Sequence, residues 1–170
     1  MNTNTDLRPY RPNVGICLFD KQGRVWIGRC ITSGPEIVEP GRDWQFPQGG
    51  IEENEDIIEA ARRELFEETG VTSVKLLHAT NQWWSYDFPV SFDDPNHKLN
   101  PFRGQKQKWV AFRFEGDDRE ISITADHVSE PQEFLDWKWA EFTTMPEKTM
   151  TFKRPQYQRV VKAFTPFLIK

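Results

Sequence analysis

The sequence predicts an α+β domain, in which a mixed β-sheet is combined with helices. Candidate strands lie both before and after one well-defined helix at residues 55–69, and a second helix is expected at 155–170. The composition supports a packed core, because 37% of the residues are hydrophobic and 14% carry large aromatic side chains. We expect one domain over residues 1–170, with a short N-terminal tail at 1–9.

Several kinds of protein are excluded by the composition. No apolar run approaches the roughly 20 residues that cross a bilayer, and the polar start of the chain lacks the apolar core of a secretory signal. Cys17 and Cys30 are too few for a disulfide framework and are interpreted as two buried thiols in a reducing compartment. We expect a cytoplasmic protein without membrane association, and the sequence implies no stable protein partner.

Short hydrophobic runs separated by turn residues predict the strands in chain order. The first two form a hairpin, because residues 20–23 have the composition of a tight turn. Proline and glycine residues indicate loops at 31–43 and 89–104, and Gly49 and Gly50 are expected in an exposed turn. The predicted strands are Val14–Phe19, Val25–Cys30, Trp44–Phe46, Val74–Thr80, Trp83–Phe88, Gln107–Phe114 and Phe134–Phe142.

The helix at 55–69 has two recognisable ends and an apolar stripe. Asn54 is expected as its N-cap, and Gly70 stands where a left-handed glycine ends a helix. Hydrophobic residues recur at helical spacing and predict the face that packs on the sheet. The residues of this stripe are Ile57, Ala61 and Leu65.

One short segment is strongly acidic, although the net charge of the chain is only −4. Residues 52–68 hold eight acidic and two basic side chains, a charge of −6, so the other residues together carry +2. Glu64, Glu67 and Glu68 stand at i, i+3 and i+4 and therefore share one helix face. Such carboxylates suit Mg²⁺ or Mn²⁺, which neutralise a polyphosphate and activate water. The spacing fits a solvated helix end with Glu–Arg pairs equally well.

Residues 49–71 also match a sequence motif at every fixed position. The Nudix box reads G-x5-E-x7-R-E-U-x-E-E-x-G-U, where U is a bulky aliphatic residue. The chain has Gly49, Glu55, Arg63-Glu64-Leu65, Glu67-Glu68 and Gly70-Val71 at these places, and it therefore resembles the Nudix hydrolases. The resemblance implies an α/β/α sandwich with a mixed sheet and a loop–helix–loop catalytic unit. It also implies attack of water on a nucleoside diphosphate linked to another group, with Mg²⁺ or Mn²⁺ as cofactor.

The similarity extends beyond the box, over about residues 10–164. The segments 10–15, 44–50, 104–109, 133–139 and 152–154 resemble those of bacterial RNA pyrophosphohydrolases and of the related hydrolases that cleave diadenosine tetraphosphate. This resemblance implies one of two substrates. One is 5′-triphosphorylated RNA, from which pyrophosphate is released, and the other is a dinucleoside polyphosphate.

The resemblance implies roles for individual residues. Glu55 and Arg63 correspond to a structural ion pair that pins the loop to the helix. Glu133 corresponds to an additional carboxylate, with Glu130 as a rival because the preceding loop is hard to align. The catalytic residues implied are Glu64, Glu67, Glu68 and Glu133, and the metal ligands are these four together with the carbonyl of Gly49.

Basic and aromatic residues in the same segments supply groups that bind a nucleotide. Arginine pairs with phosphate through a bidentate fork and lysine as a point charge. Aromatic rings such as those of Trp83 and Tyr86 can stack on bases. The substrate-binding residues expected are Arg11, Gln45, Lys106, Lys108, Phe152 and Lys153.

Two alternatives stay open. Segments 31–43 and 89–101 depart from the family pattern, the second with Asp93 and Asp94 where basic residues would serve RNA, so the sequence does not choose between RNA and a dinucleotide. The alternative function is a non-catalytic nucleotide- or RNA-binding module on the same fold. Such a module would be expected to lack some of the three helix carboxylates, all of which this chain retains.

Overall fold

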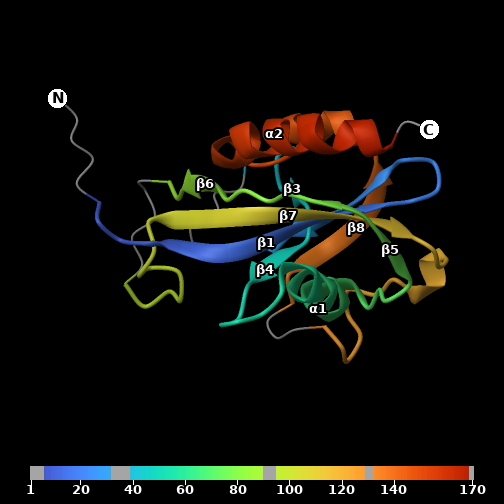
Figure 1. The fold of residues 1–170 in the computed structure, drawn as a ribbon, viewed down its shortest axis with the longest axis horizontal. Helices are drawn as coiled ribbons and strands as arrows, with labels where there is room; N and C mark the ends of the chain where they lie inside the picture. The colour runs from blue at the N-terminus through green and yellow to red at the C-terminus, as the bar shows by residue number, and fades with distance from the viewer. Residues whose placement is uncertain (1–5, 32–38, 90–94, 129–131, 169–170) are drawn as a thin grey trace.

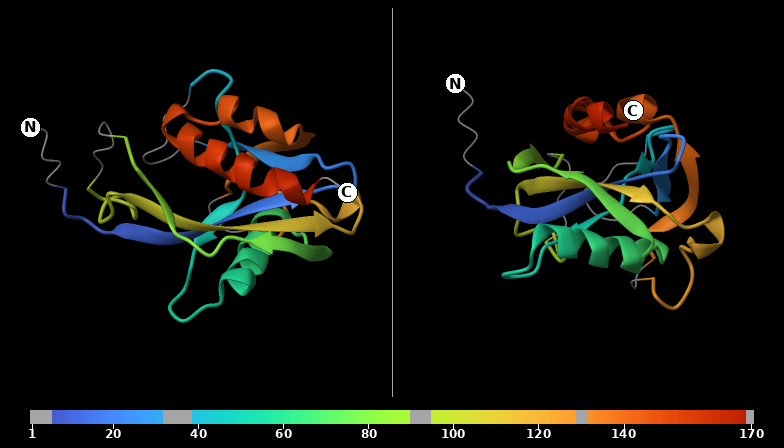
Figure 2. Two further views of the ribbon diagram at one scale, coloured as in Figure 1. Left: turned by 45° about the horizontal axis from the view of Figure 1, so that its top comes forward. Right: turned by 45° about the vertical axis from the view of Figure 1, so that its right-hand side comes forward.

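A mixed β-sheet lies between two helices in the computed structural model, which describes residues 6–31, 39–89, 95–128 and 132–168. Figure 1 shows α2 (Arg154–Phe164) over one face of the sheet and α1 (Ile57–Thr69) over the other, and the turned views of Figure 2 keep the three layers. This arrangement confirms the predicted α+β sandwich. The strands are β1 (Tyr10–Phe19), β2 (Val25–Cys30), β3 (Trp44–Gln45), β4 (Gln48–Gly50), β5 (Val74–Ala79), β6 (Trp84–Asp87), β7 (Gly104–Phe114) and β8 (Phe134–Ala140).

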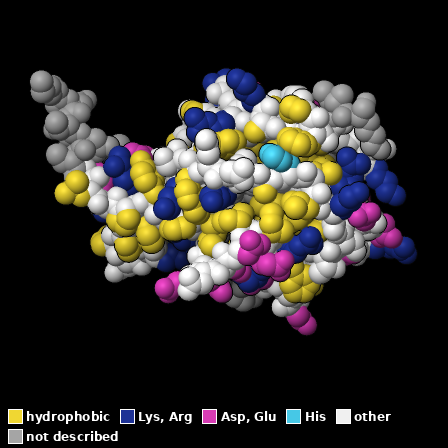
Figure 3. Space-filling model, in the orientation of Figure 1, with side chains coloured by type: hydrophobic (Ala, Val, Ile, Leu, Met, Phe, Trp, Pro, Cys, Tyr) yellow, Lys and Arg dark blue, Asp and Glu magenta, His cyan; other side chains and the backbone are white. Residues whose placement is uncertain are grey.

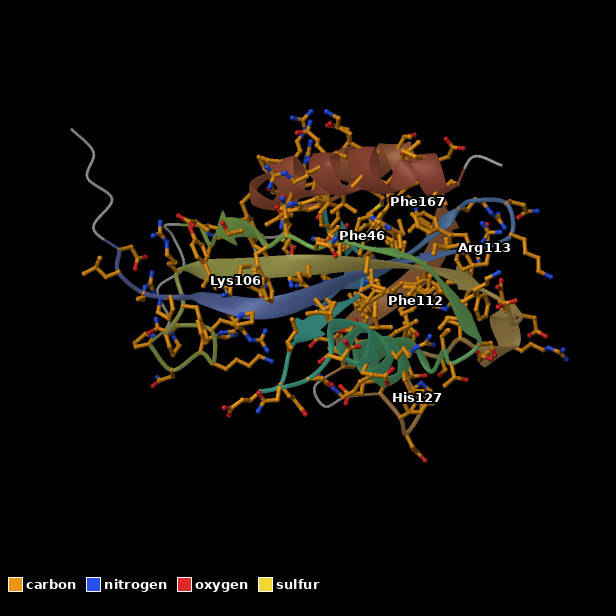
Figure 4. All side chains as sticks on the ribbon, viewed as in Figure 1. Phe46, Lys106, Phe112, Arg113, His127 and Phe167 are labelled. Atoms are coloured by element: carbon orange, nitrogen blue, oxygen red, sulfur yellow. The ribbon has the colours of Figure 1, made fainter. Side chains whose placement is uncertain are left out.

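The central ladder joins β1 and β7 in parallel over the whole length of β1. Alternate side chains along each strand point to opposite faces, so the sheet separates two cores. Val14 and Phe112 belong to the core beneath α1, whereas Cys17 and Phe46 belong to the core beneath α2. Figure 4 shows Phe112 and Phe46 on opposite sides of the sheet. Cys17 and Cys30 are both buried, as predicted.

The sheet opens on one side of β1. Strands β1 and β2 pair only beside their turn, where Phe19 lies opposite Val25. Beyond that point β1 pairs with β4, and β2 pairs with β3 and β8, so residues 44–50 lie between the separating strands. The prediction of an exposed turn at Gly49 and Gly50 is wrong, because their backbone extends the ladder of β1.

Helix α1 begins two residues later than predicted. Its N-cap is Asp56, whose carboxylate accepts hydrogen bonds from the backbone N–H groups of Ile58 and Glu59. The expected N-cap, Asn54, instead takes a left-handed conformation with φ of 64° in the preceding turn. Gly70 ends the helix as predicted, with φ of 75° and its N–H donating to the carbonyl of Phe66.

The later elements follow the predicted order with changed ends. Strand β7 begins at Gly104, three residues before the predicted strand. Helix α2 ends at Phe164 and gives way to a 3-10 turn at Thr165–Phe167, because Pro166 has no N–H to continue the α-helix. The predictions for Asp93, Asp94 and Glu130 lie outside the described residues. Within those residues, no helix is long and apolar enough to cross a membrane.

Candidate active site

The last two turns of α1 carry three glutamates at different depths. Glu68 continues the buried stripe of the helix, three residues after Leu65, and is only 5% exposed. The side chain of Glu64 is 13% exposed, whereas that of Glu67 is 37% exposed. Acidic side chains gather over α1 in the space-filling view of Figure 3. The predicted carboxylate face therefore reaches from the solvent into the core.

Glu68 is a buried carboxylate that forms no ion pair with the described part of the chain. The backbone N–H of Gln48 donates to it, but among the described residues its Oε2 has no hydrogen-bond partner. Burial raises the pKa of Glu68 well above its ordinary value, and the nearby carboxylates of Glu133 and Glu64 raise it further. An ionised carboxylate in such a place is costly unless a positive charge is added. The charge of Glu67 raises the pKa of Glu68 as well, so the structure brings the three predicted carboxylates of α1 and that of Glu133 into one electrostatic group.

Glu64 lies directly on the backbone of β4. A Cβ atom built on Gly49 would overlap the Glu64 carboxylate, so only glycine leaves room for this side chain. Burial raises the pKa of Glu64, and its hydrogen bond with Arg63 opposes that rise. The close approach also places the backbone of Gly49 beside the Glu64 carboxylate.

Arg63 organises the loop and two of the helix carboxylates. Its guanidinium donates to both oxygens of Glu55 at 2.8 and 2.9 Å and to the carbonyl of Gly50 at 2.9 Å. It also contacts Glu64 at 2.7 Å and Glu67 at 3.3 Å. The predicted ion pair between Glu55 and Arg63 is confirmed. Its hydrogen bonds lower the pKa of Glu55 to about 2.

The donor set fits a hard divalent cation. In the part of the chain that the structure describes, no three Asp, Glu, His or Cys side chains already form a closed metal-binding cluster. Arg63 holds oxygens of Glu64 and Glu67. However, the unpartnered Oε2 of Glu68 and the adjacent carboxylates offer the oxygen ligands that Mg²⁺ and Mn²⁺ prefer.

Four of the predicted substrate-binding residues lie on the α2 side of the sheet or at its edge. Lys153 is only 2% exposed and donates from Nζ to the Gln45 side chain at 2.9 Å. Phe152, next in the chain, lies with its ring 5.9 Å from that of Tyr86. These residues combine a positive charge with two aromatic faces.

Arg11 connects this side of the site with the carboxylates. Its guanidinium packs on Gly50, where a Cβ atom would overlap it. Its Nη1 donates to the Gln105 side chain at 3.2 Å, and its charge lowers the pKa of Glu64. The positive charge of Arg11 therefore lies near the Glu64 carboxylate.

Lys106 and Lys108 are not part of that group. They occupy alternate positions of β7 that face the α1 side, the side opposite to Gln105 and Gln107. Their Nζ atoms lie 4.8 and 4.9 Å from the ring centroid of Trp83. Figure 4 shows where Lys106 lies on β7. The structure thus divides the predicted substrate-binding residues between two faces of the sheet.

A set of buried amides was missed by the sequence reasoning. These side chains form hydrogen bonds with one another on the α2 side of the sheet. A signal was present, because glutamines two residues apart on a strand share one face. Strand pairing, which the sequence alone does not give, decides that the other amides join them. The buried amides are Asn13, Gln105, Gln107 and Gln156, with Gln48 half-buried beside them.

Comparison with known proteins identifies the class to which this fold and site belong. The family model described as the NUDIX domain matches residues 9–160, and the chain belongs to this family. The predicted recognition and fold are confirmed.

Particular relatives are bacterial proteins named RNA pyrophosphohydrolase. The protein from Bartonella bacilliformis is 46% identical over 168 residues, which cover 96% of this chain and 98% of the relative. The protein from Caulobacter vibrioides strain NA1000 is 48% identical over 167 residues, which cover 97% of this chain and 91% of the relative.

Solved structures share the fold at low sequence identity. An Ap4A hydrolase from C. elegans in a binary complex is 17% identical with a TM-score of 0.58, and covers 92% of this chain and 97% of its own. The dihydroneopterin triphosphate pyrophosphohydrolase of E. coli is 18% identical with a TM-score of 0.60, and covers 92% of this chain and 99% of its own.

Proposed function

We propose that this protein is a metal-dependent RNA pyrophosphohydrolase of the cytoplasm, which releases pyrophosphate from 5′-triphosphorylated RNA and also cleaves dinucleoside polyphosphates. The observation that carries the proposal is the buried Glu68 carboxylate. One of its oxygens has no hydrogen-bond partner among the residues that the structure describes, and Glu64 and Glu133 lie close enough for their charges to raise its pKa. Relatives that are 46–48% identical over nearly the whole chain bear the name RNA pyrophosphohydrolase, which supports the substrate.

The residues proposed to hold Mg²⁺ or Mn²⁺ surround the end of α1. The bound cation supplies charge neutralisation on the phosphates and lowers the pKa of a water molecule. Arg63 keeps Glu64 and Glu67 oriented, since it bonds to both and is itself fixed by Glu55. The proposed ligands are the carbonyl of Gly49 and the carboxylates of Glu64, Glu67, Glu68 and Glu133.

Positive side chains on the other side of β4 hold the substrate. Arg11 lies beside Gly50 and near Glu64, where its fork can contact the phosphate next to the scissile bond. Lys153 places a second positive charge where a departing phosphate would develop negative charge. The rings of Phe152 and Tyr86 offer a stacking surface to the base of the 5′ nucleotide.

The proposed reaction is hydrolysis of a phosphoanhydride. A water oxygen attacks one phosphorus atom, and the bond from that phosphorus to the bridging oxygen breaks. A carboxylate of the group accepts the proton of the water. With triphosphorylated RNA the leaving group is pyrophosphate, and with diadenosine tetraphosphate it is a nucleotide.

The direct test compares kcat/KM on a short 5′-triphosphorylated RNA and on diadenosine tetraphosphate, each with Mg²⁺. We expect hydrolysis of both and release of pyrophosphate from the RNA. A large advantage for the dinucleotide would refute the RNA assignment. Unchanged hydrolysis by a Glu68→Gln variant would refute the metal assignment. Tight RNA binding without any hydrolysis would favour the non-catalytic module, which no present observation supports.

A further inference from the structure

A continuous line of side-chain amides crosses the α2 side of the sheet. It begins at Tyr86, whose hydroxyl accepts from Gln105 at 2.6 Å. The Gln105 oxygen accepts from Asn13 at 2.9 Å, and the Asn13 oxygen accepts from Gln107 at 2.9 Å. Gln107 then donates to Gln48 at 2.8 Å. Four amides therefore connect strands β6, β7, β1 and β4.

Gln107 is the branch point of this line and is only 1% exposed. Its Nε2 donates to both Asn13 and Gln48, and its Oε1 accepts from Gln156 at 3.2 Å. The amide thus uses both donor hydrogens and its acceptor. If the oxygen and nitrogen of this amide exchanged places, acceptor would face acceptor and donor would face donor, and these hydrogen bonds would be lost. The network therefore fixes one orientation of the Gln107 amide.

The two ends of the line meet different parts of the proposed active site. At one end, Tyr86 neighbours Phe152, and Arg11 also donates to Gln105. At the other end, Gln48 donates its backbone N–H to the Glu68 carboxylate. Gln48 also directly precedes Gly49, on which Glu64 packs.

We propose that Gln107 is a positioning residue of this enzyme. By holding the Gln48 side chain it sets where the Gln48 N–H meets Glu68 and where Gly49 supports Glu64. Through Asn13 and Gln105 it ties that placement to Arg11 and Tyr86, the residues proposed to meet the substrate. The inference rests on the proposed function for its catalytic consequence, but the placement of Glu68 also governs metal binding without substrate.

The first test compares Gln107→Met, which keeps the volume and removes the hydrogen bonds, with a matched control. The control is Thr80→Val. It removes a hydroxyl that accepts a hydrogen bond from the backbone N–H of Trp109, which lies on β7 like Gln107. Partners of metal ligands affect affinity or activity by about 10–100-fold. We expect Gln107→Met to lower kcat by that factor with KM within about threefold, and to weaken Mn²⁺ binding measured by calorimetry without substrate. Thr80→Val should change neither.

A double-mutant cycle separates positioning from general destabilisation. Gln48→Met removes the same bond from its other end, so the double variant Gln107→Met/Gln48→Met should lose little more kcat and Mn²⁺ affinity than Gln107→Met alone. Fully additive losses of kcat and Mn²⁺ affinity in the double variant would overturn the inference. So would a Gln107→Met variant whose kcat and Mn²⁺ affinity equal those of Thr80→Val. If Gln107→Met fails to fold, Gln48→Met alone decides by the same comparison with Thr80→Val.

The calorimetric measurement keeps this inference separate from the proposed function. If the wild-type protein hydrolyses no triphosphorylated RNA, the substrate assignment fails, while Mn²⁺ binding by the variants still decides the role of Gln107. If the wild type is active and the variants bind Mn²⁺ as it does, the positioning role fails and the proposed function stands.

Discussion

Glu68 stands where the apolar stripe of α1 would otherwise continue with a hydrophobic side chain. The helix thereby buries a carboxylate whose pKa is raised by burial and by Glu133 and Glu64. Such a group destabilises the metal-free fold and becomes favourable only when a cation is bound. The same residue is therefore expected to have opposite effects on stability and on activity.

A Glu68→Gln variant separates these two effects. The neutral amide has no proton to lose on unfolding and no charge to bury, so at pH 8 we expect the metal-free protein to gain about 1 kcal/mol, or about 2–4 °C in Tm. Because Glu68 is a proposed metal ligand, the same substitution should lower kcat more than about 100-fold. Calorimetric scans in EDTA and hydrolysis assays in Mg²⁺ measure the two quantities. A variant that is less stable and equally active would contradict this account of Glu68.

The raised pKa also gives the stability of the metal-free protein a pH dependence. Folded Glu68 retains its proton above its ordinary value of 4.5, whereas unfolded Glu68 releases it there. This contribution to the free energy of unfolding is thus complete below pH 4.5 and is lost as the pH rises toward the folded pKa. Urea unfolding in EDTA should show a smaller stability difference between wild type and Glu68→Gln at pH 5 than at pH 8. An equal difference at both values would contradict the raised pKa.

At the scale of single residues, the sequence predicted the features that lie within one short segment. It missed those that depend on pairing between strands far apart in the chain. The three glutamates and the Glu55–Arg63 pair lie within one short segment, so their spacing and the motif identify them. The depth of Glu68 depends on β4 and Glu133, which come from other parts of the chain. The amide line depends on Asn13 lying opposite Gln107, a pairing between residues 94 positions apart.

Among the elements, helix α1 begins close to its predicted start, but its N-cap is Asp56 and not the expected Asn54. Both Asn54 and Asp56 are good N-cap residues, and periodicity does not choose between them. The structure chooses Asp56, because the turn at Asn54 brings Glu55 to Arg63. The start of the helix is thus fixed by an ion pair as well as by its cap.

The two candidate caps can be distinguished by substitution. Asp56→Ala removes two hydrogen bonds to backbone N–H groups and should lower the free energy of unfolding by about 1 kcal/mol. Asn54→Gly keeps the left-handed turn and should change it by less than about 0.5 kcal/mol. Urea titrations measure both values. A larger loss for Asn54→Gly than for Asp56→Ala would contradict the observed cap.

Strand β4 was expected as a turn because two adjacent glycines usually mark one. Here the glycines allow side chains from both faces to approach the backbone: Glu64 packs on Gly49 and Arg11 on Gly50. Sequence alone does not distinguish a glycine that turns the chain from one that admits a neighbour. The need for close approach becomes visible only when the helix and β1 are in place.

The close approach at Gly49 predicts a sensitive position. A Gly49→Ala substitution forces the Glu64 carboxylate away, so we expect kcat to fall by about 10–100-fold. We also expect a stability loss of about 1–3 kcal/mol from overpacking. Adding Glu64→Asp shortens the crowding side chain and should recover stability without recovering kcat. Full activity of the single alanine variant would contradict the packing described here.

At the scale of the whole molecule, the candidate site takes its residues from both faces of the sheet. The carboxylates come from α1 beneath one face, whereas Lys153 and Phe152 come from a 3-10 turn (Thr151–Lys153) directly before α2 on the other. The order of elements and the three layers could be predicted from the pattern of strands and from the Nudix box. The opening between β1 and β2 could not, because it depends on where strand pairing stops.

Because the proposed metal site draws on distant parts of the chain, cation binding should stabilise the whole fold. Saturation at 100 times Kd adds about 2.7 kcal/mol, or about 5–10 °C in Tm. The Tm shift in Mg²⁺ should be smaller at pH 6 than at pH 8, because protons compete for Glu68. It should largely disappear in Glu68→Gln, with NaCl of equal ionic strength as the control. A shift equal to that in NaCl would contradict a specific site.

The parallel pairing of β1 with β7 has a consequence for biosynthesis. Strand β1 can pair with β7 only after about a hundred further residues have been synthesised. Until then, the edge of β1 that binds β7 has no partner strand. Closing so long a loop slows folding relative to a helical bundle. The central pair of strands, and with it the proposed active site, can therefore form only after β7 has been synthesised. Translation products that end before β7 should be inactive and prone to aggregate.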